Sequence, residues 1–279
     1  MRLHSYKSSG NCLKVRILLG LLDQAEPLDG ATLLDLGSGD GLIGLAALDR
    51  VGPGGTVVFS DISDTLLEHC RRAVDARGLL GRARFVHTRA EDLAAIADGA
   101  VDVATSRSVL MYVEDKPAAF AALFRVLRPA GRISAFEPIN MLMFPEPPDR
   151  FWGYDVGAVS ELADRVKASF AELADPAAGV MRDFDDRDLA WLAEEAGFER
   201  IHLECHIDVE PGSQLRAVGF DALLDSAPNP LAPTLRAAMA TVLSTSECEA
   251  FMGHLERAIG EQRPLRRSAV AYLVAHKPG

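Results

Sequence analysis

The sequence predicts an α/β protein, built on a doubly wound, mostly parallel sheet of seven strands with helical insertions. Two observations predict this class. Short apolar strands alternate with helices through the first half of the chain, and this alternation is typical of a parallel sheet covered on both faces. A glycine-rich turn also joins the first predicted strand to the first helix, at the position where such sheets bind ligands.

The first half of the chain contains five predicted strands and three predicted helices. The segment ATLLDL at 31–36 alternates as a strand and leads through GSGDG into a helix over 42–51. A second helix, over 63–77, has Ser63 as its expected N-cap. The remaining elements expected in this half are strands at 56–60, 83–87, 101–106 and 132–137, and a helix at 116–128 that ends at Pro129-Ala130-Gly131.

After Pro138 the alternation of strands and helices stops. Residues 139–184 contain no clear strand but hold an aromatic cluster and a helix near 158–173. Segments this long inside a compact domain usually form lids or binding surfaces. We expect one domain overall. Its parts are an N-terminal helical cover (1–30), a cofactor-binding core (31–138), a lid or acceptor insertion (139–184) and the end of the sheet (185–279). This last part is expected to contain a helix at 185–197, strands at 198–210 and 268–276, and a helical insertion at about 211–266.

Composition limits the possible partners. The chain has 40 acidic and 29 basic residues and a net charge of −11, which argues against binding to nucleic acid or to an anionic membrane. No apolar run approaches the roughly 18 residues of a membrane span. Four separated cysteines without a C-x-x-C pair favour a reduced, cytoplasmic protein without a metal site. His202, Cys205 and His206 are expected to pack rather than to bind metal, since Cys205 points away from the two histidines.

The glycine loop LLDLGSGDG at 33–41 is the most informative segment. A dinucleotide fingerprint would place a third glycine at position 42, where the chain has Leu42. Asp35 also precedes the loop, and a carboxylate there suits a cationic ligand better than a phosphate. Asp61 ends the second strand, where an acid can accept both hydroxyls of a ribose.

These motifs together resemble the class I S-adenosylmethionine-dependent methyltransferases. The similarity continues through TRAEDL (88–93), VDVATSRSVL (101–110) and LRPAGRISAFEP (127–138), so that it covers 31–138. A final antiparallel pair of strands is also the ending expected for this family. The resemblance implies a Rossmann-like fold and methyl transfer from S-adenosylmethionine.

The resemblance also implies roles for single residues. Asp35 would support the loop and the ammonium group of the cofactor, and Asp61 would bind the ribose hydroxyls with Ile62 packing on the adenine. The other positions implied to touch the cofactor are Gly37, Ser38 and Gly39 (methionine portion and ribose), Ala90 and Glu91 (adenine edge), and Ser106 and Arg107 (methionine portion). The family often has an acid at the position of Arg89 and a glycine at that of Ala130.

The acceptor is expected to be a small, partly apolar molecule, such as a compound of secondary metabolism. The D/N-P-P-Y signature of amino-base methylation and a nucleophilic cysteine after strand four or five are both missing, and both insertions are rich in apolar residues. Several relatives carry two histidines where this chain has Met111 and Tyr112. The residues expected to line the acceptor pocket are Met111, Tyr112, Phe151, Trp152 and Tyr154, and the candidates for a catalytic base are Tyr112, Glu137, Tyr154 and His206.

Alternative interpretations remain open at this point. The chain could be a non-catalytic regulator or scaffold that binds S-adenosylmethionine or S-adenosylhomocysteine, or a nucleic-acid methyltransferase, which the charge disfavours. A nicotinamide oxidoreductase is disfavoured by Leu42 and Asp35. Residues 1–23 resemble the opening of bacterial glutathione transferases, but the strands that should follow are absent, so glutathione binding is not expected. The oligomeric state is expected to be monomer or homodimer.

Overall fold

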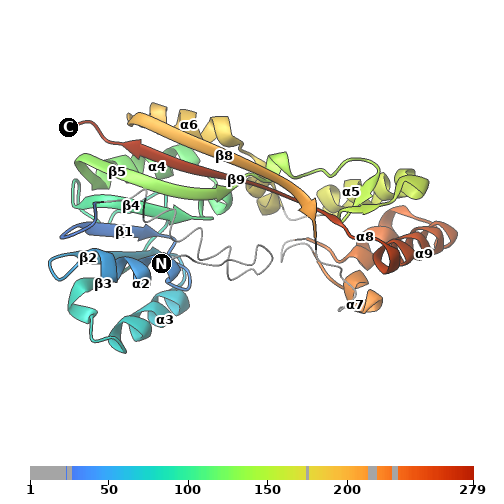
Figure 1. Ribbon diagram of the computed structural model, residues 1–279, viewed down its shortest axis with the longest axis horizontal. Helices are drawn as coiled ribbons and strands as arrows, with labels where there is room; N and C mark the ends of the chain where they lie inside the picture. Colours follow the sequence, from blue (N-terminus) through green and yellow to red (C-terminus); the bar gives the residue numbers. More distant parts are fainter. Residues whose placement is uncertain (1–22, 24–26, 174–175, 213–218, 228–231) are drawn as a thin grey trace. The chain divides into compact units, whose positions relative to one another are not determined.

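The protein divides into two compact units. Figure 1 shows the computed structural model, which describes residues 23, 27–173, 176–212, 219–227 and 232–279. The sheet unit comprises the described residues up to Pro138 together with Phe184–Cys205 and Val270–Gly279; the insertion unit comprises Ile139–Asp183 and His206–Ala269. The sequence predicts one domain with two separate insertions, and the structure groups the two insertions into one compact unit.

The sheet has seven strands in the order β3-β2-β1-β4-β5-β9-β8, which confirms the predicted fold class. β1 to β5 pair in parallel, and β9 is antiparallel to β5. Figure 1 draws β8 and β9 as long neighbouring arrows that point in opposite directions. The strands are β1 (Thr32–Leu36), β2 (Thr56–Asp61), β3 (Ala83–His87), β4 (Val101–Arg107), β5 (Leu127–Pro138), β8 (Glu199–Pro211) and β9 (Leu265–His276).

Helices of the sheet unit follow the predicted order. They are α2 (Leu42–Arg50), α3 (Asp64–Asp75), α4 (Lys116–Val126) and α6 (Asp186–Glu195), with short 3₁₀ turns η1 (Leu80–Arg82) and η2 (Leu110–Tyr112). The Ser63 hydroxyl accepts a hydrogen bond from Leu66 N, which confirms the predicted N-cap. The helix expected over 116–128 ends earlier, because Leu127 already pairs with Val101 as the first residue of β5.

A two-stranded ribbon corrects the expectation that 139–184 contains no strand. β6 (Arg150–Phe151) pairs with β7 (Tyr154–Asp155) across a turn at Trp152 and Gly153. Both turn residues have positive φ, 52° and 80°, as a tight hairpin turn requires. Strands of two residues are too short to show an alternating pattern in the sequence.

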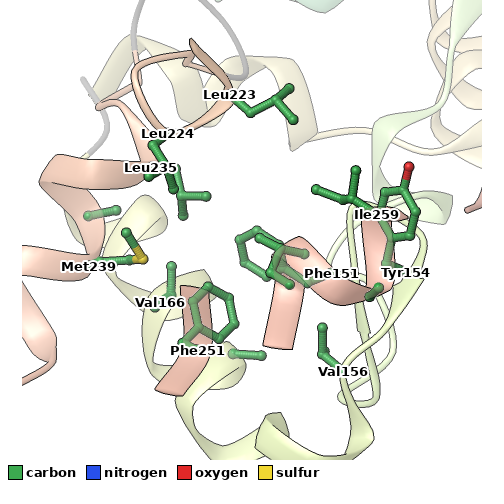
Figure 2. Packing of buried hydrophobic residues seen from close by; sticks show 14 of the residues in the cluster. Phe151, Tyr154, Val156, Val166, Leu223, Leu224, Leu235, Met239, Phe251 and Ile259 are labelled. Carbon is green, nitrogen blue, oxygen red and sulfur yellow. The ribbon is translucent and has the colours of Figure 1, made fainter. Parts of the chain in front are cut away.

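Apart from the ends of β8 and β9, the remaining described elements of the insertion unit are helical. They are α5 (Ser160–Leu173), α7 (Phe220–Leu224), α8 (Leu235–Val242) and α9 (Thr245–Glu261), and the 3₁₀ turns η3 (Asn140–Leu142), η4 (Gly157–Val159) and η5 (Pro176–Arg182). Figure 2 shows the core that they share, with Phe151 and Val166 from the first insertion beside Met239 and Phe251 from the second. The rings of Phe151 and Phe251 meet edge to face with their centroids 5.2 Å apart. Both insertions are therefore needed to complete one hydrophobic core.

Two expectations concern residues near the start of the chain. Most of the predicted N-terminal cover (1–30) and of the glutathione-transferase-like opening (1–23) lies outside the described residues. Within the described ranges, no helix combines the length and the apolar character that a membrane span requires.

Candidate active site

The glycine loop connects β1 to α2 at the carboxyl edge of the sheet. Gly37, Gly39 and Gly41 have φ angles of 60°, 53° and 81°, which glycine adopts without strain. A Cβ added to Gly37 would lie 2.4 Å from Cγ2 of Val109, whereas one added to Gly39 would meet nothing closer than 4.0 Å. The loop is therefore packed against the chain at Gly37 and open at Gly39.

Asp35, which precedes this loop, is hydrogen-bonded to α2. Its Oδ2 accepts a hydrogen bond from Gly44 N at 2.8 Å, and the side chain is buried. Burial, only partly offset by the Gly44 amide, raises the pKa of Asp35 from 3.8 to about 7. These contacts fit the predicted support of the loop, and the predicted contact with the ammonium group of the cofactor stays a prediction.

Gly44 is a residue that the sequence reasoning missed. A Cβ at this helical position would lie 2.3 Å from Cε1 of Phe59, a ring of β2 that is fully buried. Its missing side chain lets α2 approach the sheet while its amide reaches Asp35. The sequence does indicate a special role for this position, because glycine is unfavourable inside a helix and the predicted helix LIGLAAL nevertheless contains one.

Asp61 lies beside the open side of the loop. Its Oδ2 accepts from Gly39 N at 2.8 Å and its Oδ1 accepts from Ser63 N at 2.9 Å. Each carboxylate oxygen has a second lone pair, so Asp61 can accept two further donors. Ile62 follows with 69% of its surface exposed, which leaves an apolar face at the end of β2.

The segment after β3 contains an ion pair. Arg89 Nη2 lies 2.8 Å from Glu91 Oε1, so the arginine that departs from the family pattern is paired with the predicted adenine-edge acid. The side chain of Glu91 is 15% exposed and that of Arg89 is 69% exposed, while Ala90 between them is buried. The segment thus has a small buried residue beside a carboxylate that is ion-paired to Arg89.

Glu137 organises the segment after β4. Its Oε1 accepts from Val109 N at 3.0 Å and from Leu110 N at 3.1 Å, and the Ser106 hydroxyl lies 3.4 Å from the same oxygen. Its Oε2 is buried and has no hydrogen-bond partner among the described residues. Burial, which outweighs the amide contacts, raises the pKa of Glu137 from 4.5 to about 7.

This raised pKa predicts a pH dependence of stability. Between about pH 4.5 and 7 the unfolded chain loses the Glu137 proton while the folded protein keeps it, so the free energy of unfolding falls as pH rises. Glu137→Gln cannot ionise and should remove up to about 3 kcal/mol of that fall. Urea unfolding of both proteins at pH 5 to 8 measures the difference. Parallel stability curves would show that Glu137 keeps an ordinary pKa.

The other residues predicted for the cofactor site, the acceptor pocket or catalysis are divided between the sheet unit and the insertion unit. Arg107 lies at the end of β4, with Nη2 3.9 Å from Asp40 Oδ1. Met111 is buried and Tyr112 is 64% exposed in η2 of the sheet unit. In the insertion unit Phe151 and Tyr154 are buried core residues and Trp152 packs against that core; Figure 2 shows Phe151 and Tyr154 there. His206 is exposed on β8.

For Phe151 and Tyr154 the structure therefore provides a packing role, and their part in an acceptor pocket stays a prediction. The same holds for Tyr112, Tyr154 and His206 as catalytic bases. Among the described residues no cluster of histidine, cysteine and acidic side chains could hold a metal ion.

Comparison with known proteins identifies the family. A family model described as a methyltransferase domain matches residues 34–135. Over 210 residues the chain is 32% identical to nocamycin O-methyltransferase of Saccharothrix syringae, a match that covers 73% of this chain and 70% of that protein. The chain belongs to the class I S-adenosylmethionine-dependent methyltransferases. As a member of this family, it is an enzyme that transfers a methyl group from S-adenosylmethionine to a small-molecule acceptor.

Two further matches are consistent with this methyltransferase family. The enzyme is 30% identical over 180 residues to the ubiquinone/menaquinone biosynthesis C-methyltransferase of Cronobacter sakazakii, covering 62% of this chain and 68% of that protein. Its fold resembles the structure of geranyl diphosphate methyltransferase in complex with S-adenosylmethionine, with a TM-score of 0.53 and 17% identity over 96% of this chain and 86% of that one. The fold of that complex is thus shared along nearly the whole methyltransferase.

The residues at the carboxyl edge of the sheet fit this cofactor chemically. Ser38 Oγ is buried and has no hydrogen-bond partner among the described residues, and a buried hydroxyl without a partner is costly. The carboxylate of Asp61 can accept further hydrogen bonds beside Gly39, where the loop is open. A ligand with hydroxyl donors and a positive charge would satisfy both groups.

Proposed function

We propose that this methyltransferase methylates a small, largely apolar molecule of secondary metabolism on an oxygen atom. The observation that carries the proposal is the similarity to nocamycin O-methyltransferase, because the match spans 73% of this chain and so extends well beyond residues 34–135. The apolar residues of the two insertions are consistent with an acceptor of this kind. Methylation on carbon is the second candidate, favoured by the similarity to the ubiquinone/menaquinone enzyme.

We assign the cofactor contacts to the residues that the sequence predicted. Asp61 accepts the ribose hydroxyls while it holds Gly39 N, and the exposed Ile62 covers one face of the adenine. Ala90 and Glu91 meet the adenine edge, and the backbone of Ser106 and Arg107 lies along the methionine portion. The remaining members of this site are Asp35, Gly37 and Ser38.

The protein contributes alignment and the exclusion of water to the reaction. When bound, S-adenosylmethionine supplies an electrophilic methyl group on a positively charged sulfur. An in-line displacement depends mainly on the geometry in which the two reactants are held. Glu137 serves this geometry by holding the Val109 and Leu110 amides, and Val109 in turn packs against Gly37.

An acceptor hydroxyl must also lose its proton. Of the four candidate bases, Glu137 combines a fixed orientation, an oxygen without a hydrogen-bond partner in the described part of the chain, and a pKa raised to about 7. A group with such a pKa can take up a proton near neutral pH. We therefore rank Glu137 above Tyr112, Tyr154 and His206 for this role.

The setting of the reaction follows from charge and composition. With a net charge of −11, the enzyme should not bind nucleic acid unaided. Its cysteines, which include no C-x-x-C pair, suit the reducing cytoplasm. We propose a cytoplasmic enzyme that acts on freely diffusing metabolites.

Transfer of a labelled methyl group tests this proposal. The protein and methyl-labelled S-adenosylmethionine are incubated with phenols, enols, quinones and an oligonucleotide, and products are identified by mass spectrometry. We expect label on the oxygen of an apolar small molecule and none on the oligonucleotide. Label on carbon would select the second candidate. Tight binding of S-adenosylhomocysteine without turnover of any of these acceptors would contradict the proposed acceptor class.

A further inference from the structure

We propose that two copies of this chain pair through the edge strand β8, antiparallel and centred on Cys205, so that their sheets join into one continuous sheet. β8 is the last strand in the sheet order, and among the described residues no further strand pairs with its outer edge. An edge of this kind presents backbone N–H and C=O groups to any strand that can pair with it.

The sequence of β8 is complementary to itself in this register. Residues 201–209 read IHLECHIDV. With Cys205 opposite Cys205 of the second copy, a residue that precedes Cys205 by a given number of positions faces the residue of the other copy that follows Cys205 by the same number. Glu204 then faces His206, and His202 faces Asp208, so that every carboxylate meets an imidazole that can donate an N–H. On the other face Leu203 meets Ile207 and Ile201 meets Val209.

Neighbouring registers lose this match. Moving the centre to Glu204 sets that carboxylate against its own copy, and moving it to His206 sets Glu204 against Asp208. Like charges directly opposite each other destabilise a strand pair. Centres between two residues would place the charged face of one strand beside the apolar face of the other. The Cys205-centred register thus avoids every unfavourable pair in this segment.

Burial along β8 supports the assignment of the two faces. Ile201, Leu203 and Cys205 are half-buried, while the even-numbered side chains between them are exposed. Burial raises the pKa of Cys205, and the nearby carboxylates of Asp186 and Asp185 at the start of α6 raise it further, so Cys205 lies on the side of β8 that α6 approaches. His202 Nε2 lies 3.2 Å from Glu204 Oε1, so the pair would extend an existing row of charged contacts.

The apolar row continues beyond the half-buried part. Ile207 is 59% exposed and Val209 is 51% exposed. Edge strands that avoid association often carry lysine or proline. Residues 201–209 contain neither, and Pro211 at the last position of β8 lies outside the proposed pair. In the proposed pair Ile207 packs on Leu203 of the second copy and Val209 packs on Ile201, which removes both from water.

Sedimentation of the full chain tests the proposal. We expect a dimer that Glu204→Lys weakens at least about tenfold, since the new charge then faces His206 without an acid to pair with. The double variant Glu204→Lys/His206→Glu reverses the contact and should restore the dimer. The control is Glu256→Lys on α9, another exposed acid. A chain that stays monomeric at every concentration, or a dimer that Glu204→Lys leaves unchanged, would overturn the proposal.

Cross-linking provides a second readout without a charge change. Directly opposed residues of an antiparallel pair have Cα atoms about 4.5 to 5.5 Å apart, a separation that a disulfide can bridge. Diamide, which takes up two protons and two electrons from two thiols, should therefore give a covalent dimer of the unaltered protein. Cys205→Ser should abolish this product and Cys248→Ser should not. A product that persists in Cys205→Ser would contradict the register.

Discussion

Replacing Asp61 with alanine should weaken the binding of S-adenosylmethionine about 100-fold and leave the protein folded. The change removes the acceptor proposed for the ribose hydroxyls and the one that holds Gly39 N and Ser63 N. Hydrogen bonds to a charged group contribute about 1.5–3 kcal/mol each, and a factor of 100 corresponds to about 2.7 kcal/mol. Titration calorimetry with S-adenosylmethionine, without an acceptor, measures the affinity of both proteins.

The matched control for this experiment is Asp64→Ala. Asp64 lies three residues along the chain and has a side chain that is 82% exposed, so its removal should leave the affinity unchanged. Circular dichroism of both variants confirms that they remain folded. Equal affinities of the Asp61→Ala protein and the unaltered enzyme would remove Asp61 from the cofactor site.

Replacing Gly44 with alanine should destabilise the protein by about 1–3 kcal/mol. The new methyl group would lie 2.3 Å from the Phe59 ring, which is fully buried, and inserting atoms into a packed core usually costs that much. The effect runs against helix propensity, which favours alanine over glycine by nearly 1 kcal/mol. Urea unfolding, followed by circular dichroism, measures the change.

A second helical glycine provides the comparison. Gly253 lies inside α9, where an added Cβ would meet nothing closer than Arg257 Nη1 at 3.8 Å. Gly253→Ala should therefore stabilise the protein slightly through helix propensity. If Gly44→Ala stabilised the protein as well, the close approach of α2 to β2 would not be a constraint on this position.

Local patterns in the sequence predicted most of the sheet unit. The strands of a parallel sheet are short apolar runs, and Ser63 marks the start of α3 through the chemistry of its hydroxyl. The glycine loop and Asp61 were predictable because both follow strands whose carboxyl ends meet at one edge. The hydrogen bond between Gly39 N and Asp61 shows this convergence directly.

Long-range packing explains what the sequence did not reveal. The ribbon of β6 and β7 is too short for a periodic signal, and β5 begins at Leu127 because it pairs with Val101 of another strand. Phe151 and Tyr154 suggested a binding pocket because aromatic residues suit both pockets and cores. Their burial against residues of the second insertion could be recognised only once the two segments were seen to share one core.

The position of β9 in the sheet has a consequence for how the chain folds during synthesis. β9 is the last described strand along the sequence, yet it lies between β5 and β8. A nascent chain that had emerged only as far as residue 264 would therefore hold β8 with no strand to pair with inside its own sheet. The apolar side chains of Ile201, Leu203, Ile207 and Val209 would then lack the neighbouring strand β9 on a ribosome-bound intermediate. Unpaired strands of this kind are prone to aggregate, so the growing chain should be most prone to aggregation until β9 is added.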